Sequence, residues 1–290
     1  MNAQKIALLT DTGTNTPASF IAEHDIRVAP LQITYSDGTS YRSGIDITPA
    51  QLIERFKDEI PKTSLPTPQY IRDLFEQARA DGYERAVFVT LSSGLSATNQ
   101  TVKLVASQME NFPVVVVDSL SIGVAAGMVV IAAAEMIEAG VPFHCLQRKL
   151  DALAATTRVY FSTKTLEYLR KGGRISESVY RLGSMLNIKP VIMCNESGHY
   201  VVARKARGWE RSLETEVRLA QEHAQKFKKV RLAICCSDAD DYFDMLEGRL
   251  RAAMAEVGVE IESFVYSDVS PDLLVHTGPD LVGIGVQGVA

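Results

Sequence analysis

Short apolar runs alternate with longer amphipathic stretches through the first half of the chain. The runs at residues 5–10, 86–90 and 114–117 predict buried strands, because brief apolar segments bounded by turn residues suit strands that are covered on both faces. A long apolar stretch at residues 122–138 predicts a buried helix, which Gly140 ends. This alternation predicts an α/β fold whose first part is a mostly parallel, Rossmann-like sheet with helices on both faces.

The pattern changes after residue 157. Strand-like runs at residues 189–193 and 200–206 enclose a polar turn, which predicts a β-hairpin. A strand, a helix and a further strand follow within residues 232–266. We therefore expect two domains, residues 1–157 and residues 158–290, of which the second is an α/β domain with a mixed or antiparallel sheet.

Polar residues follow the predicted strands of the first domain, most clearly at residues 91–100, LSSGLSATNQ. In a parallel sheet, ligands gather at the carboxyl ends of the strands. The hydroxyl of Ser93 can donate a hydrogen bond, Gly94 lets the backbone approach a ligand, and the start of a helix favours negative charge. This stretch is therefore a candidate carboxylate or anion site, although most serine clusters in such turns are ordinary helix caps and turn residues.

Two other stretches carry candidate site residues. Thr63 and Ser64 lie in an expected extended loop before two prolines, and they lack the helix-capping role that suits Thr67. Arg170 and Arg174 flank two glycines, so they suit contact with a phosphate or with an acidic partner. The alternative for this turn is an ordinary helix end, where basic side chains stabilise the helix dipole.

Charge and cysteine content argue against several classes of protein. The net charge is −5, and the basic residues form no stripe, so nucleic acid is not an expected partner. The cysteines have no C-x-x-C spacing, and the neighbours Cys235 and Cys236 would point to opposite faces of a strand. We therefore expect neither a metal site nor a disulfide. Residues 283–288 match the dinucleotide-binding glycine pattern, but too little chain follows for the required helix, so no cofactor is expected.

The apolar runs also bear on where the protein works. The run at residues 6–9 is too short for a signal peptide, and the stretch at residues 122–134 falls short of the roughly 20 residues that cross a bilayer. We expect a cytoplasmic protein without stable membrane insertion.

Several segments in order together resemble the DegV family of bacterial lipid-binding proteins: KTSLPTP, LSSGLSATNQ, VVDS, YLRKGGRI, NIKPVI and HTGPDLVGIGV. The resemblance extends from the first predicted strand to the last. It implies a long-chain fatty acid in a tunnel between two domains. The residues that it implies for the lipid carboxylate are Thr63, Ser64, Ser93, Gly94 and His276. One departure is Asp280, which stands where the family usually has glycine.

Some members of this family are the fatty-acid-binding subunits of fatty acid kinase. The resemblance therefore implies a lipid-binding protein that is not itself an enzyme. It also implies a separate ATP-dependent kinase as a partner, which Arg170 and Arg174 would serve directly or through a phosphate.

Ser93 and His276 leave an enzyme as the alternative. A serine hydrolase could use Ser93 as nucleophile and His276 as base, with Asp11, Asp118 or Asp280 orienting the imidazole. The turn lacks the G-x-S-x-G elbow that is typical of such nucleophiles, which favours the binding protein. A third alternative is a regulatory protein that binds no small molecule.

Overall fold

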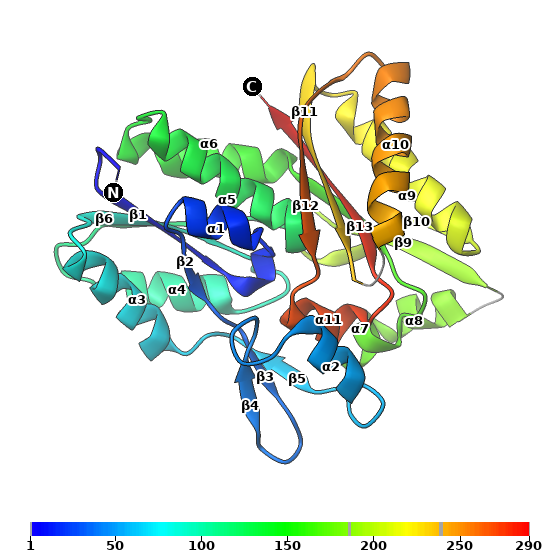
Figure 1. Ribbon diagram of the computed structural model, residues 1–290, viewed down its shortest axis with the longest axis horizontal. Coiled ribbons are helices and arrows are strands. Elements are labelled where there is room, and N and C mark those ends of the chain that lie inside the picture. The colour runs from blue at the N-terminus through cyan, green and yellow to red at the C-terminus, as the bar shows by residue number, and fades with distance from the viewer. Residues whose placement is uncertain (1, 185–186, 238–239, 290) are drawn as a thin grey trace.

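The computed structural model describes residues 2–184, 187–237 and 240–289, and within them the strands form three sheets (Figure 1). The first sheet has the order β2-β1-β6-β7, and its strand pairs are all parallel. Its members are β1 (Ile6–Asp11), β2 (Arg27–Ala29), β6 (Arg85–Thr90) and β7 (Val114–Asp118). The predicted parallel sheet is therefore confirmed.

Helices cover both faces of this sheet, as the buried strands require. On one face, Leu9 and Phe88 pack with Phe75 of α3 (Pro68–Ala80) and with residues of α4 (Thr98–Ala106). On the other face, Leu8 packs with residues of α5 (Gly123–Glu138) and with Leu146 of α6 (Phe143–Thr156). Successive residues of one strand thus enter different cores. The short helices η1 (Thr12–Thr14) and α1 (Ala18–Glu23) follow β1.

The second sheet is mixed and has the order β10-β9-β8-β13-β11-β12. Among its described pairs, β11 and β12 are parallel and the others are antiparallel. Its strands are β8 (Arg158–Ser162), β9 (Ile188–Cys194), β10 (Tyr200–Arg207), β11 (Lys229–Cys236), β12 (Glu260–Asp268) and β13 (Val282–Val289). The helices α9 (Trp209–Ala224) and α10 (Asp240–Glu256) cover one face. Cys235 and Cys236 belong to different cores on the two faces, as predicted, and both are free thiols.

The helix α5 lies between the two large sheets and packs on both (Figure 1). A β-carbon on Gly285 of β13 would lie 2.7 Å from Cε of Met128 and 3.5 Å from Cα of Ala125, both on α5. Glycine at this position therefore lets the second sheet approach the helix closely. The glycines that mimic a dinucleotide motif thus lie inside a central strand between β8 and β11.

A small third sheet has the order β4-β3-β5 and corrects one expectation. It consists of β3 (Gln32–Thr34), β4 (Ser40–Arg42) and β5 (Lys62–Ser64). The segment that includes Thr63 and Ser64 was expected to be a loop, but it pairs with β3, where it finds backbone partners. Pro30 separates β2 of the first sheet from β3, because proline lacks the backbone donor that a continuous strand needs.

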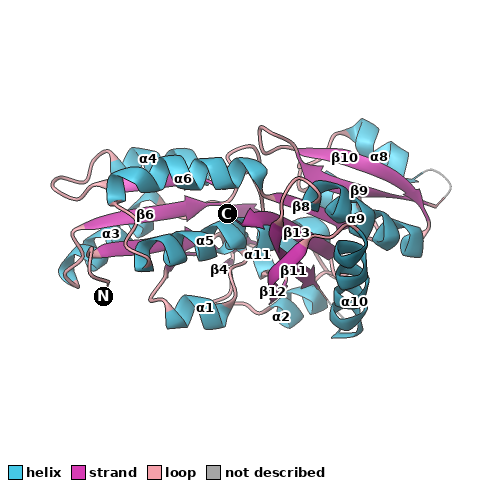
Figure 2. Cartoon of the chain, turned by 90° about the horizontal axis from the view of Figure 1, so that it is seen from above, coloured by secondary structure: helices cyan, strands magenta, loops and turns pink. Residues whose placement is uncertain are grey.

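Four shorter helices complete the described structure: α2 (Pro49–Arg55), α7 (Glu167–Lys171), α8 (Glu177–Ser184) and α11 (Pro271–Thr277). Sequence patterns did not predict α11, which packs against α7 and α2. The proposed division into residues 1–157 and 158–290 falls between α6 and β8. The view in Figure 2 shows the two large sheets side by side along the long axis of the molecule. Among the described residues, no helix combines the length and the apolar character that crossing a membrane requires.

Candidate functional site

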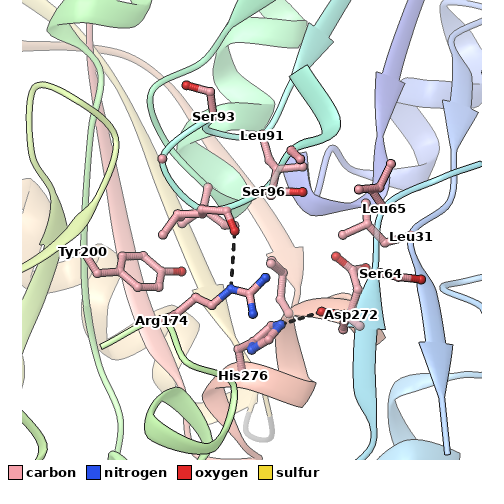
Figure 3. Close-up of a pocket in the computed structure, with 16 residues that line it drawn as sticks. Leu31, Ser64, Leu65, Leu91, Ser93, Ser96, Arg174, Tyr200, Asp272 and His276 are labelled. Atoms are coloured by element: carbon pink, nitrogen blue, oxygen red, sulfur yellow. Dashed lines mark hydrogen bonds between the residues drawn. The ribbon is translucent and has the colours of Figure 1, made fainter. Parts of the chain in front are cut away.

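A cavity of about 480 Å³ lies where the carboxyl end of β6 meets β5, α11 and the start of β10 (Figure 3). The residues that the resemblance assigned to a carboxylate all line this cavity: Thr63, Ser64, Ser93, Gly94 and His276. They come from both proposed domains and from positions 63 to 276 of the chain. The fold therefore brings the candidate carboxylate-binding residues to one place.

The carboxyl groups of buried Asp11 and half-buried Asp118 hold the turn that carries Ser93. The backbone N–H of Leu91 donates to Oδ2 of Asp11 at 2.9 Å, and that of Ser93 donates to Oδ1 of Asp118 at 3.2 Å. Burial raises the pKa of Asp11 to about 8, even though the backbone bond from Leu91 lowers it. Both aspartates therefore contact backbone amides of the turn and brace it.

The serines of the turn have different local roles. The helix α4 begins only at Thr98, with Ala97 as its N-cap residue, so Ser93 does not cap it. Ser96 does take part in local turn bonding, because its Oγ accepts from the backbone N–H of Thr98 at 3.3 Å. The alternative role as a cap or turn residue therefore fits Ser96 better than Ser93.

The β9–β10 hairpin of the proposed second domain contacts this turn. Oγ of Ser92 donates to the carbonyl oxygen of Gly198 at 2.9 Å and accepts from the N–H of Gly94 at 3.1 Å. A β-carbon on Gly94 would lie only 2.7 Å from the backbone of Ser197 and Gly198. Gly94 thus permits a close contact between the halves of the molecule, and this contact brings Tyr200 to the cavity wall.

Thr63 and His276 contact each other across the cavity wall. Nε2 of His276 lies 2.7 Å from Oγ1 of Thr63, whereas Nδ1 is buried and has no hydrogen-bond partner among the described residues. Burial and, to a smaller extent, the charge of Arg174 lower the pKa of His276 to about 3. The imidazole is therefore neutral at pH 7. A β-carbon on Gly172 would lie 2.1 Å from Nδ1, so the ring needs a glycine there.

The two candidate arginines lie in different places. Arg174 lines the cavity, and its guanidinium donates to the carbonyl oxygens of Leu95 at 3.4 Å and Gly172 at 2.5 Å. Arg170 instead lies over the ring of Tyr180, with 4.2 Å from Cζ to the ring centroid. The same turn also ends α7, since the N–H of Arg174 donates to the carbonyl of Leu169. The turn is therefore a helix end, and contact of Arg174 with a phosphate or an acidic partner stays a prediction.

A second, apolar cavity of about 30 Å³ adjoins the first. The two share Ile122, Tyr200 and Leu273 as lining residues. The smaller cavity extends between α5 and the inner face of the second sheet, next to Val159 and Phe161. No sequence motif marks its walls, because they are ordinary core positions that face the gap between two sheets.

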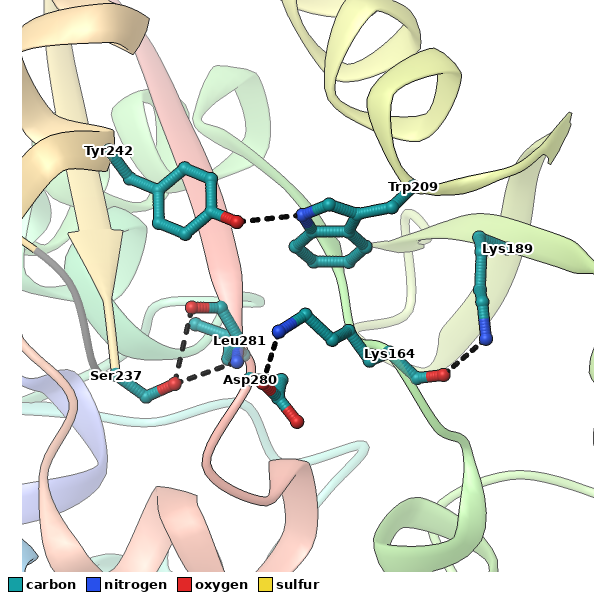
Figure 4. A network of polar contacts seen from close by, with 7 residues as sticks. All are labelled: Lys164, Lys189, Trp209, Ser237, Tyr242, Asp280 and Leu281. Atoms are coloured by element: carbon teal, nitrogen blue, oxygen red, sulfur yellow. Dashed lines mark hydrogen bonds and ion pairs between the residues drawn. The ribbon is translucent and has the colours of Figure 1, made fainter.

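Asp280 forms an ion pair with Lys164. Its Oδ1 accepts from Nζ of Lys164 at 2.8 Å, near the Trp209–Tyr242 pair (Figure 4). It is not among the residues that line the cavity. The cavity does include Asp272, which sequence patterns did not single out. Recognition of α11 would have shown it, because Asp272 and His276 stand four positions apart and share one helix face.

The hydrolase alternative finds little geometric support. The described hydrogen bonds join His276 to Thr63 and not to Ser93. Asp118 contacts the turn and Asp280 contacts Lys164, so neither lies on Nδ1 of the imidazole. The nucleophile, base and orienting acid of a triad are thus not assembled in the described residues.

Known proteins resemble the chain over its whole length. The family model described as "Uncharacterised protein, DegV family" matches residues 5–288. A DegV domain-containing protein of Clostridium acetobutylicum is 33% identical over 282 residues, which cover 97% of this chain and 98% of the relative. A Thermotoga maritima protein named "Fatty acid-binding protein" is 27% identical over 290 residues, which cover 98% of each chain.

The fold is similar to solved structures of the same kind. The structure of a DegV family protein from Thermus thermophilus, described by its fatty acid binding, matches with a TM-score of 0.89 at 28% identity. That match covers 100% of each chain. The two-domain α/β architecture of the chain is therefore that of solved DegV proteins.

Proposed function

Because this chain belongs to the DegV family, we propose that it binds a long-chain fatty acid in the cavity beside Ser93 and His276. The observation that carries the proposal is the meeting of separate polar segments at one cavity that continues into an apolar one. The proposed carboxylate ligands are Thr63, Ser64, Ser93, Gly94 and His276. The acyl tail extends past Tyr200 between the domains of residues 1–157 and 158–290.

The two ends of such a ligand contribute differently to binding. About 15 buried methylenes at roughly 0.8 kcal/mol each provide on the order of 12 kcal/mol before the costs of association. Hydrogen bonds to the carboxylate contribute about 1.5–3 kcal/mol each and fix the direction of the lipid. Neutral hydroxyls and a neutral imidazole suit this task, and Arg174 adds a positive charge at the cavity.

The apolar cavity must widen to admit a tail. Its volume of about 30 Å³ is close to the volume that one molecule occupies in liquid water. Tyr200 lines both cavities, and its ring packs on Phe161 with 5.2 Å between centroids. We therefore propose that Tyr200 moves when the tail enters.

Mass spectrometry of the purified protein tests the function. We expect a long-chain fatty acid to be recovered after denaturing extraction, and native spectra to show one lipid for each chain. Protein that stays empty even after incubation with palmitate or oleate would contradict the proposal.

We further propose that the protein presents its fatty acid to a separate ATP-dependent kinase. The support is the placement of Arg174 at the cavity and of Arg170 on the neighbouring surface, where its guanidinium lies 3.8 Å from Glu177. Guanidinium groups suit an acyl phosphate or acidic residues of a partner.

The kinase proposal is tested with Arg170→Ala and Arg174→Ala, supplied with a cognate kinase and ATP. Both variants should form acyl phosphate more slowly. Arg170→Ala should keep its lipid, since Arg170 is not among the residues that line the cavity. Arg181→Ala is a matched control on α8, since Arg181 also pairs with Glu177. Normal rates in stable, lipid-loaded variants would exclude the role.

A further inference from the structure

Asp272 places a buried carboxyl group in the wall of the proposed head-group cavity. Its side chain is 1% exposed, and it occupies the first turn of α11. Oδ1 accepts from the hydroxyl of Ser43 at 2.5 Å, and the same hydroxyl oxygen accepts from the N–H of Asp272 at 3.0 Å. Oδ2 is also buried and has no hydrogen-bond partner among the described residues. Asp272 lines the cavity, and one of its carboxyl oxygens thus lacks a hydrogen bond from the described residues.

The groups around Asp272 do not neutralise it. No described ion pair includes it, and the side chains that interact with its carboxyl group are the hydroxyls of Ser43, of Thr12 and of Ser270, the N-cap residue of α11. Burial raises its pKa, while those hydroxyls lower it. Asp11, at the end of β1, is a second buried acid whose pKa the charge of Asp272 raises. Two acids therefore lie near each other behind the cavity wall.

Other charged groups on the elements around α11 have their own partners or lie outside. His276 is one turn further along the same helix and is neutral, and Arg174 lines the cavity. On α7, Glu167 pairs with Lys171, and Arg170 contacts Glu177. On α2, Glu54 pairs with Lys57, and Arg55 donates to Tyr41. Lys62 of β5 is exposed.

A fatty acid carboxylate in this cavity would therefore meet a second carboxyl group. Two carboxylates in one buried site cannot both stay ionised at low cost, so one of them is protonated. We propose that Asp272 shares one proton with the carboxylate of the bound lipid, its Oδ2–H donating to the lipid oxygen. The inference rests on the proposed function and adds that the site selects a head group able to accept this hydrogen bond.

This arrangement makes binding depend on pH. When both groups are ionised before they meet, the complex takes up one proton from solvent, which leaves an aspartic acid beside a carboxylate. The affinity for oleate should then fall up to tenfold for each pH unit above the pKa of Asp272 in the empty protein. Titration calorimetry between pH 6 and 9, in two buffers with different ionisation enthalpies, measures both the affinity and the proton count.

Variants assign the proton to one residue. Asp272→Asn keeps a neutral donor, so it should bind oleate with an affinity that does not change with pH and without proton uptake. Asp280→Asn is the matched control, because Asp280 lies outside the cavity and pairs with Lys164; it should keep the pH dependence of the wild type. His276→Gln should also keep it. Melting temperatures confirm that each variant is folded.

The outcomes separate the inference from the function on which it rests. Wild-type protein that binds no oleate at any pH would contradict the proposed function. Oleate binding whose affinity does not change with pH would overturn only the inference. A pH dependence of the affinity that remains in Asp272→Asn would also overturn the inference. Loss of the pH dependence in His276→Gln or in Asp11→Asn would assign the proton to that residue instead.

Discussion

Thr63 and His276 stand 213 positions apart in the chain, and their side chains meet at 2.7 Å between Oγ1 and Nε2. One lies on an edge strand of the small sheet and the other near the end of a short helix in the second domain. The contact therefore depends on the correct placement of both proposed domains. It also leaves the imidazole with a fixed orientation at the cavity wall.

Removal of the Thr63 hydroxyl should weaken lipid binding without unfolding the protein. Thr63→Val keeps the shape but leaves Nε2 of His276 and the lipid carboxylate without a partner, which costs about 1–3 kcal/mol of binding free energy. Ser93→Ala should have an effect of similar size. Calorimetry with oleate measures both, and Thr34→Val on the neighbouring strand is the control. Unchanged affinity in both cavity variants would place the head group elsewhere.

A methyl group at Gly172 should displace His276. The added carbon would lie 2.1 Å from Nδ1, so the ring must move and lose its contact with Thr63. We expect oleate affinity to fall by about 1–3 kcal/mol, the size of one lost hydrogen bond with its partner left unpaired. Gly248→Ala serves as control, since nothing lies within 4 Å of its added carbon. Equal affinity in the two variants would show that the ring position does not matter.

Acid should destabilise the protein through His276. Its pKa is lowered from 6.5 to about 3, so between these values the unfolded chain binds a proton that the folded chain does not. The stability is complete above pH 6.5 and decreases as the pH falls toward 3, by at most about 3 kcal/mol at pH 4. Urea unfolding of wild type and His276→Gln should show a difference in unfolding free energy that becomes smaller from pH 7 to pH 4. A constant difference would contradict this expectation.

The contact between Ser92 and Gly198 should stabilise the association of the two halves. Ser92→Ala leaves a carbonyl oxygen unpaired at a buried interface, which costs about 1–3 kcal/mol of unfolding free energy. Ser107→Ala provides the comparison, because the described side-chain hydrogen bond of this exposed serine lies within its own helix end. Denaturant titrations measure both, and equal stability of the two variants would show that the contact is dispensable.

The sequence was informative where local pattern decides structure. The buried strands of the first sheet and the long helix α5 follow from apolar runs, and the Ser93 turn follows from its place after β6. The strand β5 could not be predicted in this way, because it is three residues long and owes its extension to pairing with β3. An edge strand of three residues is too short to show the alternation of polar and apolar residues that identifies a strand.

The missed helix α11 had the larger consequence for the site. It opens with Ser270 and Pro271, a typical helix start, but its seven residues are nearly all buried and so show no amphipathic period. If the helix is not recognised, Asp272 is placed in a loop, where nothing relates it to His276. The apolar walls near Phe161 likewise depend on how two sheets meet, which no local pattern encodes.

The position of α5 determines how the chain can be divided. This helix is buried along almost its whole length and covers faces of both large sheets, so residues 158–290 made alone would expose the β11 and β13 surface that it shields. We therefore expect that the two proposed domains do not fold independently and that they melt in a single transition. If the chain is cut at residue 157, we expect each half to be soluble only when the other half is present.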